Sequence, residues 1–121
     1  MALAKDVMGG GFSAAAAQAI NGAVASSVSA AGTGQSDATV LKASINYVST
    51  VASGAGVQLY DGVIGDSQIV HNAGANALTV YPPSGDSIQV ASANAGVTLP
   101  TNTTCKYVKV TATKWIGLQS A

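Results

Sequence analysis

The chain has 121 residues, enough for one hydrophobic core but not for two domains of ordinary size. Charged residues make up only 8% of it and hydrophobic residues 48%, so small polar residues must cover much of the surface. The formal net charge is zero and there is no arginine, which excludes the dense positive field that ordinary nucleic-acid binding needs.

The N-terminal residues differ in composition from the rest of the chain and are expected to form an arm. Met1–Met8 mixes apolar residues with one charge of each sign, and Gly9-Gly10-Gly11 then gives a hinge with little conformational preference. We therefore divide the chain into an N-terminal arm with a short helix, residues 1–24, and a β domain, residues 25–121.

A short helix is predicted directly after the hinge. Ser13 is a suitable N-cap, Ala14–Ile20 can form two turns, and Asn21-Gly22 would end them. Ala23-Val24-Ala25 resembles the cleavage site of a secretory signal, and a secreted surface or pilin-like protein is therefore an alternative; glycines and polar residues interrupt the apolar stretch before it. No run reaches the ~20 apolar residues of a membrane span, so no membrane partner is expected.

The remainder of the chain has the pattern of a mainly β protein. Short β-prone stretches alternate with Gly, Asn, Asp and Pro at close intervals, which predicts a single antiparallel β-sandwich or barrel-like domain of about seven to ten short strands. The predicted strands are Ala25–Ser29, Thr39–Leu41, Asn46–Val51, Gly56–Tyr60, Ser67–His71, Ala77–Tyr81, Ser87–Val90, Gly96–Leu99, Thr104–Thr111 and Trp115–Gln119. No internal repeat of useful strength is visible.

Two of these stretches alternate clearly between apolar and polar residues. In Leu78–Tyr81 the residues Leu78 and Val80 share one face, and Pro82-Pro83 ends the strand by removing two backbone donors. In Tyr107–Thr111 the two valines face one way, and the tyrosine, lysine and threonine face the other. Both patterns indicate half-buried strands with one wet face, and the last two strands are expected to form a hairpin.

Few residues in this sequence are candidates for catalysis. His71 and Cys105 are the only histidine and cysteine, and no third residue can be named that would orient them as a nucleophilic pair. Asp61 and Asp66 bracket a glycine-containing loop, but turn chemistry explains them better than Ca²⁺ binding, because alternating oxygen ligands are missing. We predict a non-enzyme with no catalytic residues, no metal site and no cofactor.

The aromatic residues raise the alternative of carbohydrate binding, since flat rings stack on sugar faces. Asn72, Asn76 and Asp61 could supply hydrogen bonds beside such rings. The single tryptophan is expected in the core or at an interface rather than on a ligand platform. The candidate rings are Tyr47, Tyr60, Tyr81, Tyr107 and Trp115.

Three stretches of the β domain carry a resemblance to a known group of proteins. The segments 72–88, with the core Asn-Ala-Leu-Thr-Val-Tyr-Pro-Pro-Ser-Gly-Asp, 94–100 and 107–115 resemble small β proteins that tailed phages encode. The resemblance covers roughly residues 38–118. It implies a virion component, and similar modules occur both as head decoration proteins and within fibre or tail proteins.

The N-terminal arm favours the decoration role. Met1–Met8 before a triple glycine resembles the short arms that decoration proteins lay across neighbouring capsid subunits, whereas a long fibre would show repeats or a coiled-coil stalk. The expected function is therefore a cement protein on the outer surface of the capsid, binding the major capsid protein as a homotrimer. A carbohydrate- or receptor-binding module of a fibre or tail is the alternative. The expected arm anchors are Leu3, Val7, Met8 and Phe12, and the expected subunit-interface residues are Tyr81 and Tyr107.

Overall fold

The computed structural model describes residues 23–120, and in this range the chain forms strands and no helix. The mainly β prediction is confirmed, and every predicted strand is present with ends that agree to within two residues. The predicted helix and the arm lie outside the described residues. The ten strands are β1 (Val24–Ser29), β2 (Thr39–Val40), β3 (Ile45–Thr50), β4 (Gly56–Gln58), β5 (Ser67–Asn72), β6 (Leu78–Tyr81), β7 (Ser87–Ile88), β8 (Val97–Leu99), β9 (Thr104–Lys109) and β10 (Lys114–Gln119).

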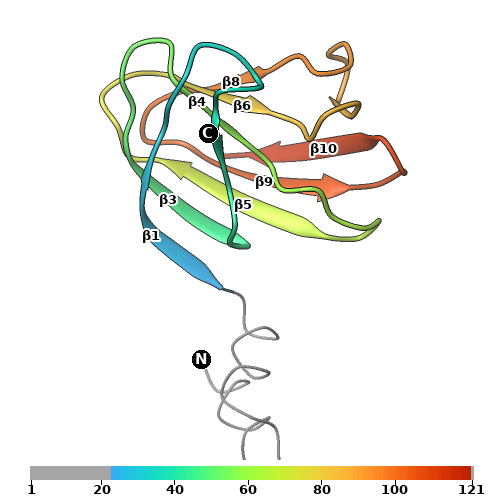
Figure 1. The fold of residues 1–121 in the computed structure, drawn as a ribbon. Coiled ribbons are helices and arrows are strands. Elements are labelled where there is room, and N and C mark those ends of the chain that lie inside the picture. The colour runs from blue at the N-terminus through green and yellow to red at the C-terminus, as the bar shows by residue number, and fades with distance from the viewer. Residues whose placement is uncertain (1–22, 121) are drawn as a thin grey trace, which may run out of the picture.

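The strands form two sheets that lie in separate layers (Figure 1). The six-stranded sheet has the order β1-β3-β5-β9-β10-β7, and the four-stranded sheet has the order β2-β4-β6-β8. The first six strands alternate between the layers, because each odd-numbered strand joins the larger sheet and each even-numbered strand the smaller one. The chain from β1 to β6 is therefore wound as a coil, in a solenoid-like arrangement rather than a clear sandwich.

The sheets are mixed, which corrects the prediction of an antiparallel domain. In the coil β1 runs parallel to β3, β3 to β5, β2 to β4 and β4 to β6. Successive strands of one sheet are joined through a strand of the other sheet, and this crossover brings the chain back to the side from which it started. Alternation in the sequence indicates which residues of a strand share a face, but it carries no information on whether neighbouring strands run parallel or antiparallel.

The last part of the chain closes one side of the coil. In the four-stranded sheet β8 pairs antiparallel with β6. In the six-stranded sheet β9 lies between β5 and β10 and is antiparallel to both, and β7 adds in parallel to β10 at the edge. The predicted C-terminal hairpin is thus confirmed as β9–β10.

The core fills the space between the two layers. Its most deeply buried members come from both sheets and include Val48, Val70, Leu78, Leu99 and Trp115, which are all completely shielded from solvent. Large aliphatic residues on the inner faces meet one tryptophan, so a chain with few aromatic residues still fills its interior.

In β9 the buried face is the opposite of the one that the apolar pattern of the sequence suggests. Tyr107 and Lys109 are 2% and 6% exposed, whereas Val110 is 40% exposed and Val108 is only half-buried. Register explains this: Tyr107 pairs with Gln68, a residue that is itself completely buried. A lysine can occupy an inner position because aspartates lie within reach of its amine.

Candidate interaction surface

The outward side of the six-stranded sheet carries rows of aliphatic residues that cross several strands. One row joins Val24, Ile45 and Ile69 by their register, and continues through Lys106 to Leu118 on β10. A second row joins Ser67, Val108 and Ile116. We call the side formed by these rows, together with Tyr47 and His71 next to the first row, the outer face.

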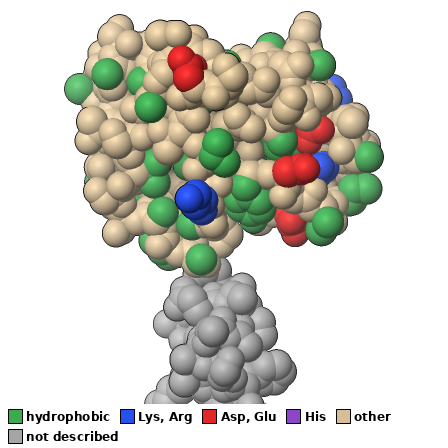
Figure 2. Space-filling view, viewed as in Figure 1, with side chains coloured by type: hydrophobic (Ala, Val, Ile, Leu, Met, Phe, Trp, Pro, Cys, Tyr) green, Lys and Arg blue, Asp and Glu red, His purple; other side chains and the backbone are tan. Residues whose placement is uncertain are grey.

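The outer face is apolar and nearly uncharged. Leu118 is 66% exposed, Val24 60% and Ile116 41%, so these side chains have no packing partner among the described residues that covers them. Lys106 is the charged residue within the rows. Elsewhere too the surface is sparse in charge, and Figure 2 shows only scattered acidic and basic groups on the side of the molecule in view. Exposed apolar side chains grouped on a sheet face are typical of an interaction surface.

A stacked aromatic pair lies beside the first aliphatic row, on the side away from the second row. The rings of Tyr47 and His71 are 5.4 Å apart between centroids and inclined by 22°, and Tyr47 is 47% exposed. His71 Nδ1 lies 2.7 Å from Thr104 Oγ1 on the next strand, which fixes the ring plane. The pair gives the outer face a flat polar element that can form hydrogen bonds with a partner.

An ion-pair cluster lies on the inner side of the same sheet. The Lys109 amine donates to Asp61 Oδ1 at 3.2 Å and to the Gly62 carbonyl at 2.9 Å, and it lies 3.5 Å from Asp86 Oδ2. Trp115 Nε1 donates to the same Asp86 oxygen at 2.9 Å, and the amine is 5.8 Å from the indole centroid. Burial disfavours the charged form of the Lys109 amine. The Asp61 and Asp86 carboxylates favour the charged form more strongly, so the pKa of Lys109 is raised.

The structure separates the groups considered for catalysis. His71 and Cys105 lie on neighbouring strands, but His71 is on the outer face and Cys105 is buried in the core. Burial raises the pKa of the Cys105 thiol, which disfavours the reactive thiolate. Asp66 accepts a hydrogen bond from the Val63 amide at 3.0 Å and has the predicted turn role. No group of three or more His, Cys, Asp or Glu residues could hold a metal ion within residues 23–120.

Several of the residues considered for sugar binding have structural roles in the fold. Trp115 is completely buried, in agreement with the expected core position. Asn72 donates to the Asn76 and Leu99 carbonyls and accepts from the Gly74 amide, and Asn76 donates to the Val51 carbonyl. Of the candidate rings, Tyr47 presents the largest exposed fraction.

The two predicted subunit-interface residues, Tyr107 and Tyr81, lie in different environments. Tyr107 is a core residue, so the expectation that it points outward to a neighbouring subunit is wrong. Tyr81 is half-buried on the outward side of the four-stranded sheet, with its ring close to Gly56 and Gly96, and its interface role stays a prediction. The arm anchors Leu3, Val7, Met8 and Phe12 lie outside the described residues.

Sequence reasoning missed the outer face. Each of its strands contributes only one or two aliphatic residues, so no single stretch is conspicuous, and the rows appear only when the register joins strands that are distant in the sequence. A usable signal was present in β10, where Ile116 and Leu118 alternate with the buried side of the strand.

Comparisons with protein-family models, with curated proteins and with solved structures found no match. Within residues 23–120 there is no helix long and apolar enough to span a membrane.

Proposed function

We propose that this protein is a capsid decoration protein of a tailed phage, which binds the outside of the head and bridges neighbouring subunits of the major capsid protein. The observation that carries the proposal is the outer face, a broad apolar side of the six-stranded sheet with exposed Val24, Ile116 and Leu118. The resemblance of residues 72–115 to small phage β proteins supports the virion assignment. No catalytic role is proposed.

The chemistry of the outer face suits attachment to a large lattice. Burying its aliphatic side chains is favourable at roughly 25 cal/mol per Å², and the near absence of charge keeps the desolvation cost low. A specific contact needs on the order of 1,000 Å² of buried area. The outer face and the arm, with its proposed anchors Leu3, Val7, Met8 and Phe12, would share that area.

The proposed mechanism is stabilisation by binding. Each copy contacts more than one capsid subunit, so pressure from the packaged genome must break these added contacts before the shell opens. A protein that binds the assembled lattice and not the dissociated subunits shifts the equilibrium towards the closed shell. Assembly as a homotrimer, with Tyr81 at the contact between copies, would add avidity because several arms engage together.

Cryo-electron microscopy of the phage particle tests the location. We expect density for this chain over the junctions between capsomers, with the outer face turned towards the shell. Density confined to the tail or a fibre would overturn the proposal and favour the receptor-binding alternative, in which the exposed Tyr47 and His71 pair is the first candidate for a ligand platform.

A charge introduced on the outer face tests the surface itself. Leu118→Lys places a charge in the proposed contact, and we expect binding to heads that lack the protein to weaken by tenfold or more, because the ammonium group would be desolvated without a partner. Val63→Lys adds the same charge to the exposed loop before β5, next to the inward-facing Lys109, and is expected to bind normally. Equal binding by the two variants, measured by co-sedimentation with heads, would exclude the outer face as the contact.

A further inference from the structure

The coil of strands is covered at one end and open at the other. At the C-terminal end β8 and β9 pair with the last strands of the coil, but no described strand pairs with the outward edges of β1 and β2. β1 has six residues and contains neither a charged residue nor proline, two of the features that protect edge strands, and its pairing with β3 has two register shifts. Stacked coils generally need a cap at each end.

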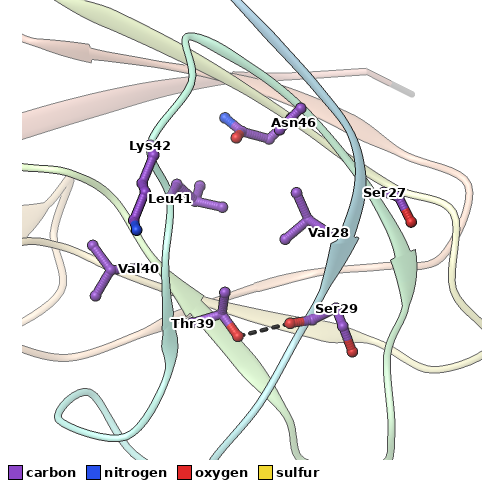
Figure 3. Close-up of a pocket in the computed structure, with 9 residues that line it drawn as sticks. Ser27, Val28, Ser29, Thr39, Val40, Leu41, Lys42 and Asn46 are labelled. Carbon is purple, nitrogen blue, oxygen red and sulfur yellow. Dashed lines mark hydrogen bonds between the residues drawn. The ribbon is translucent and has the colours of Figure 1, made fainter.

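A groove lies at this open end, between β1 and β2. It has a volume of about 310 Å³. Figure 3 shows Val28 of β1 and Leu41 after β2 directed towards one another across it, with Lys42 at one side. Its walls are mostly apolar, and Lys42 is the charged residue among those that line it.

One lining residue has an unmet requirement for a hydrogen bond. Asn46 is 1% exposed, and its side-chain amide donates to the Ala43 carbonyl at 2.9 Å and to the Ile69 carbonyl at 3.2 Å. Its Oδ1 atom has no hydrogen-bond partner among the described residues. Figure 3 shows this side chain directed towards the space between β1 and β2. A buried acceptor without a donor is costly, so an occupant that supplies an N–H group would be favoured.

We propose that residues 13–20 of the same chain occupy this groove and cap the open end of the coil. The segment Ser-Ala-Ala-Ala-Ala-Gln-Ala-Ile contains no charged residue, as the apolar walls require, and it carries backbone and Gln18 N–H groups that can serve Asn46 Oδ1.

The attachment point of the segment favours the same chain over a second copy. The Ala23 amide donates to Ser44 Oγ at 3.1 Å and its carbonyl accepts from the Ile45 amide at 3.0 Å, so the chain leaves the domain at a fixed place beside the groove. Only Asn21-Gly22 separates Ile20 from this point. A linker this short gives an effective concentration of about millimolar or more, well above that of another molecule in dilute solution.

Disulfide trapping in the full-length protein tests the proposal. In a Cys105→Ser background, the pair Ala16→Cys and Val28→Cys is expected to oxidise to an intramolecular disulfide, which requires Cα atoms within about 7 Å. The matched pair Ala16→Cys and Val63→Cys uses an exposed loop elsewhere on the molecule and is expected to remain reduced. Intact mass and a non-reducing gel give the readout. A disulfide-linked dimer at Val28→Cys would show that a second copy is the occupant, and no disulfide, or equal oxidation of both pairs, would also overturn the proposal.

Hydrogen exchange gives a second measurement without engineered cysteines. We expect the β1 amides that are not bonded to β3 to exchange at least tenfold more slowly in the native protein than in Ile20→Asp, because the charge expels the cap from the groove. Val63→Asp serves as the control and should leave β1 unchanged. Equal β1 exchange in the native protein and Ile20→Asp would contradict the cap. Neither experiment involves phage heads, so the outcome is independent of the proposed function.

Discussion

Single side chains decide which face of β9 is buried. Alternation along this strand suggested that its valines enter the core, but Tyr107 and Lys109 do so instead. The sequence reports the period, whereas the choice of face depends on partners that are far away in the chain: Gln68 beside Tyr107, and Asp61 and Asp86 around the Lys109 amine. A lysine is accepted at an inner position where two carboxylates compensate for its lost hydration.

The two aspartates of this cluster are expected to differ in their effect on stability. Asp86 is buried and also accepts from Trp115, so Asp86→Ala should lower the free energy of unfolding by about 3 kcal/mol, since it leaves a buried donor and a weakened ion pair. Asp61 has an 81% exposed side chain, and Asp61→Ala should cost less than about 1 kcal/mol. Urea unfolding followed by the fluorescence of Trp115 measures both, and equal losses would contradict this account of the cluster.

Stability is expected to fall at alkaline pH. Burial raises the pKa of the Tyr107 phenol, so the unfolded chain releases this proton first, near pH 10. Burial disfavours the charged form of Lys109, but the nearby Asp61 and Asp86 raise the pKa of the lysine overall. The stabilising contribution of Lys109 is therefore complete below the unfolded pKa of about 10.4, and it is lost as the pH rises through the folded pKa.

Urea midpoints between about pH 8 and pH 11 test this direction. Tyr107→Phe should flatten the alkaline decline, because it removes the phenol that resists ionisation in the folded state. Tyr47→Phe changes an exposed ring and should retain the decline of the native protein. A midpoint that rises with pH in this range would be inconsistent with both shifts.

At the scale of elements, the sequence predicted where strands occur but not how they pair. Gly, Asn, Asp and Pro mark the ends of the strands well, and Asn102, between β8 and β9, has a positive φ of 61°, which an asparagine in a turn tolerates. Strand direction was predicted wrongly because the crossovers of the coil contain strands themselves and look locally like a series of hairpins. No sequence repeat marks the coil, since successive turns share a path through space and not a residue pattern.

Close packing of β4 against β6 depends on a glycine. A Cβ atom at Gly56 would lie 2.7 Å from the Thr79 carbonyl oxygen and 2.7 Å from the Tyr81 ring. Gly56→Ala is therefore expected to destabilise the protein by about 1–3 kcal/mol, because a backbone atom cannot move aside cheaply. Gly34→Ala, whose Cβ would meet nothing closer than 3.8 Å, is the control and should be nearly neutral. Thermal unfolding of the two variants distinguishes them, and similar transition temperatures would contradict the packing argument.

At the scale of the whole molecule, the two layers have different roles. Inner faces build the core, and the outer face of the six-stranded sheet combines exposed aliphatic residues with very little charge. Composition predicted a poorly charged surface without locating its apolar part. The shell-binding difference expected between Leu118→Lys and Val63→Lys belongs to this scale, because it depends on the side of the molecule and not on the charge alone.

The position of β9 between β5 and β10 also affects how the chain is completed during synthesis. The coil from β1 to β6 can begin to form as it leaves the ribosome, but the free edge of β5 stays unpaired until residues 104–109 have also been synthesised. A nascent or prematurely terminated chain therefore presents a six-residue strand that is ready to pair with another such chain. The β9–β10 hairpin acts as a latch, and its arrival ends the period in which the edge of β5 is open to pairing with another chain.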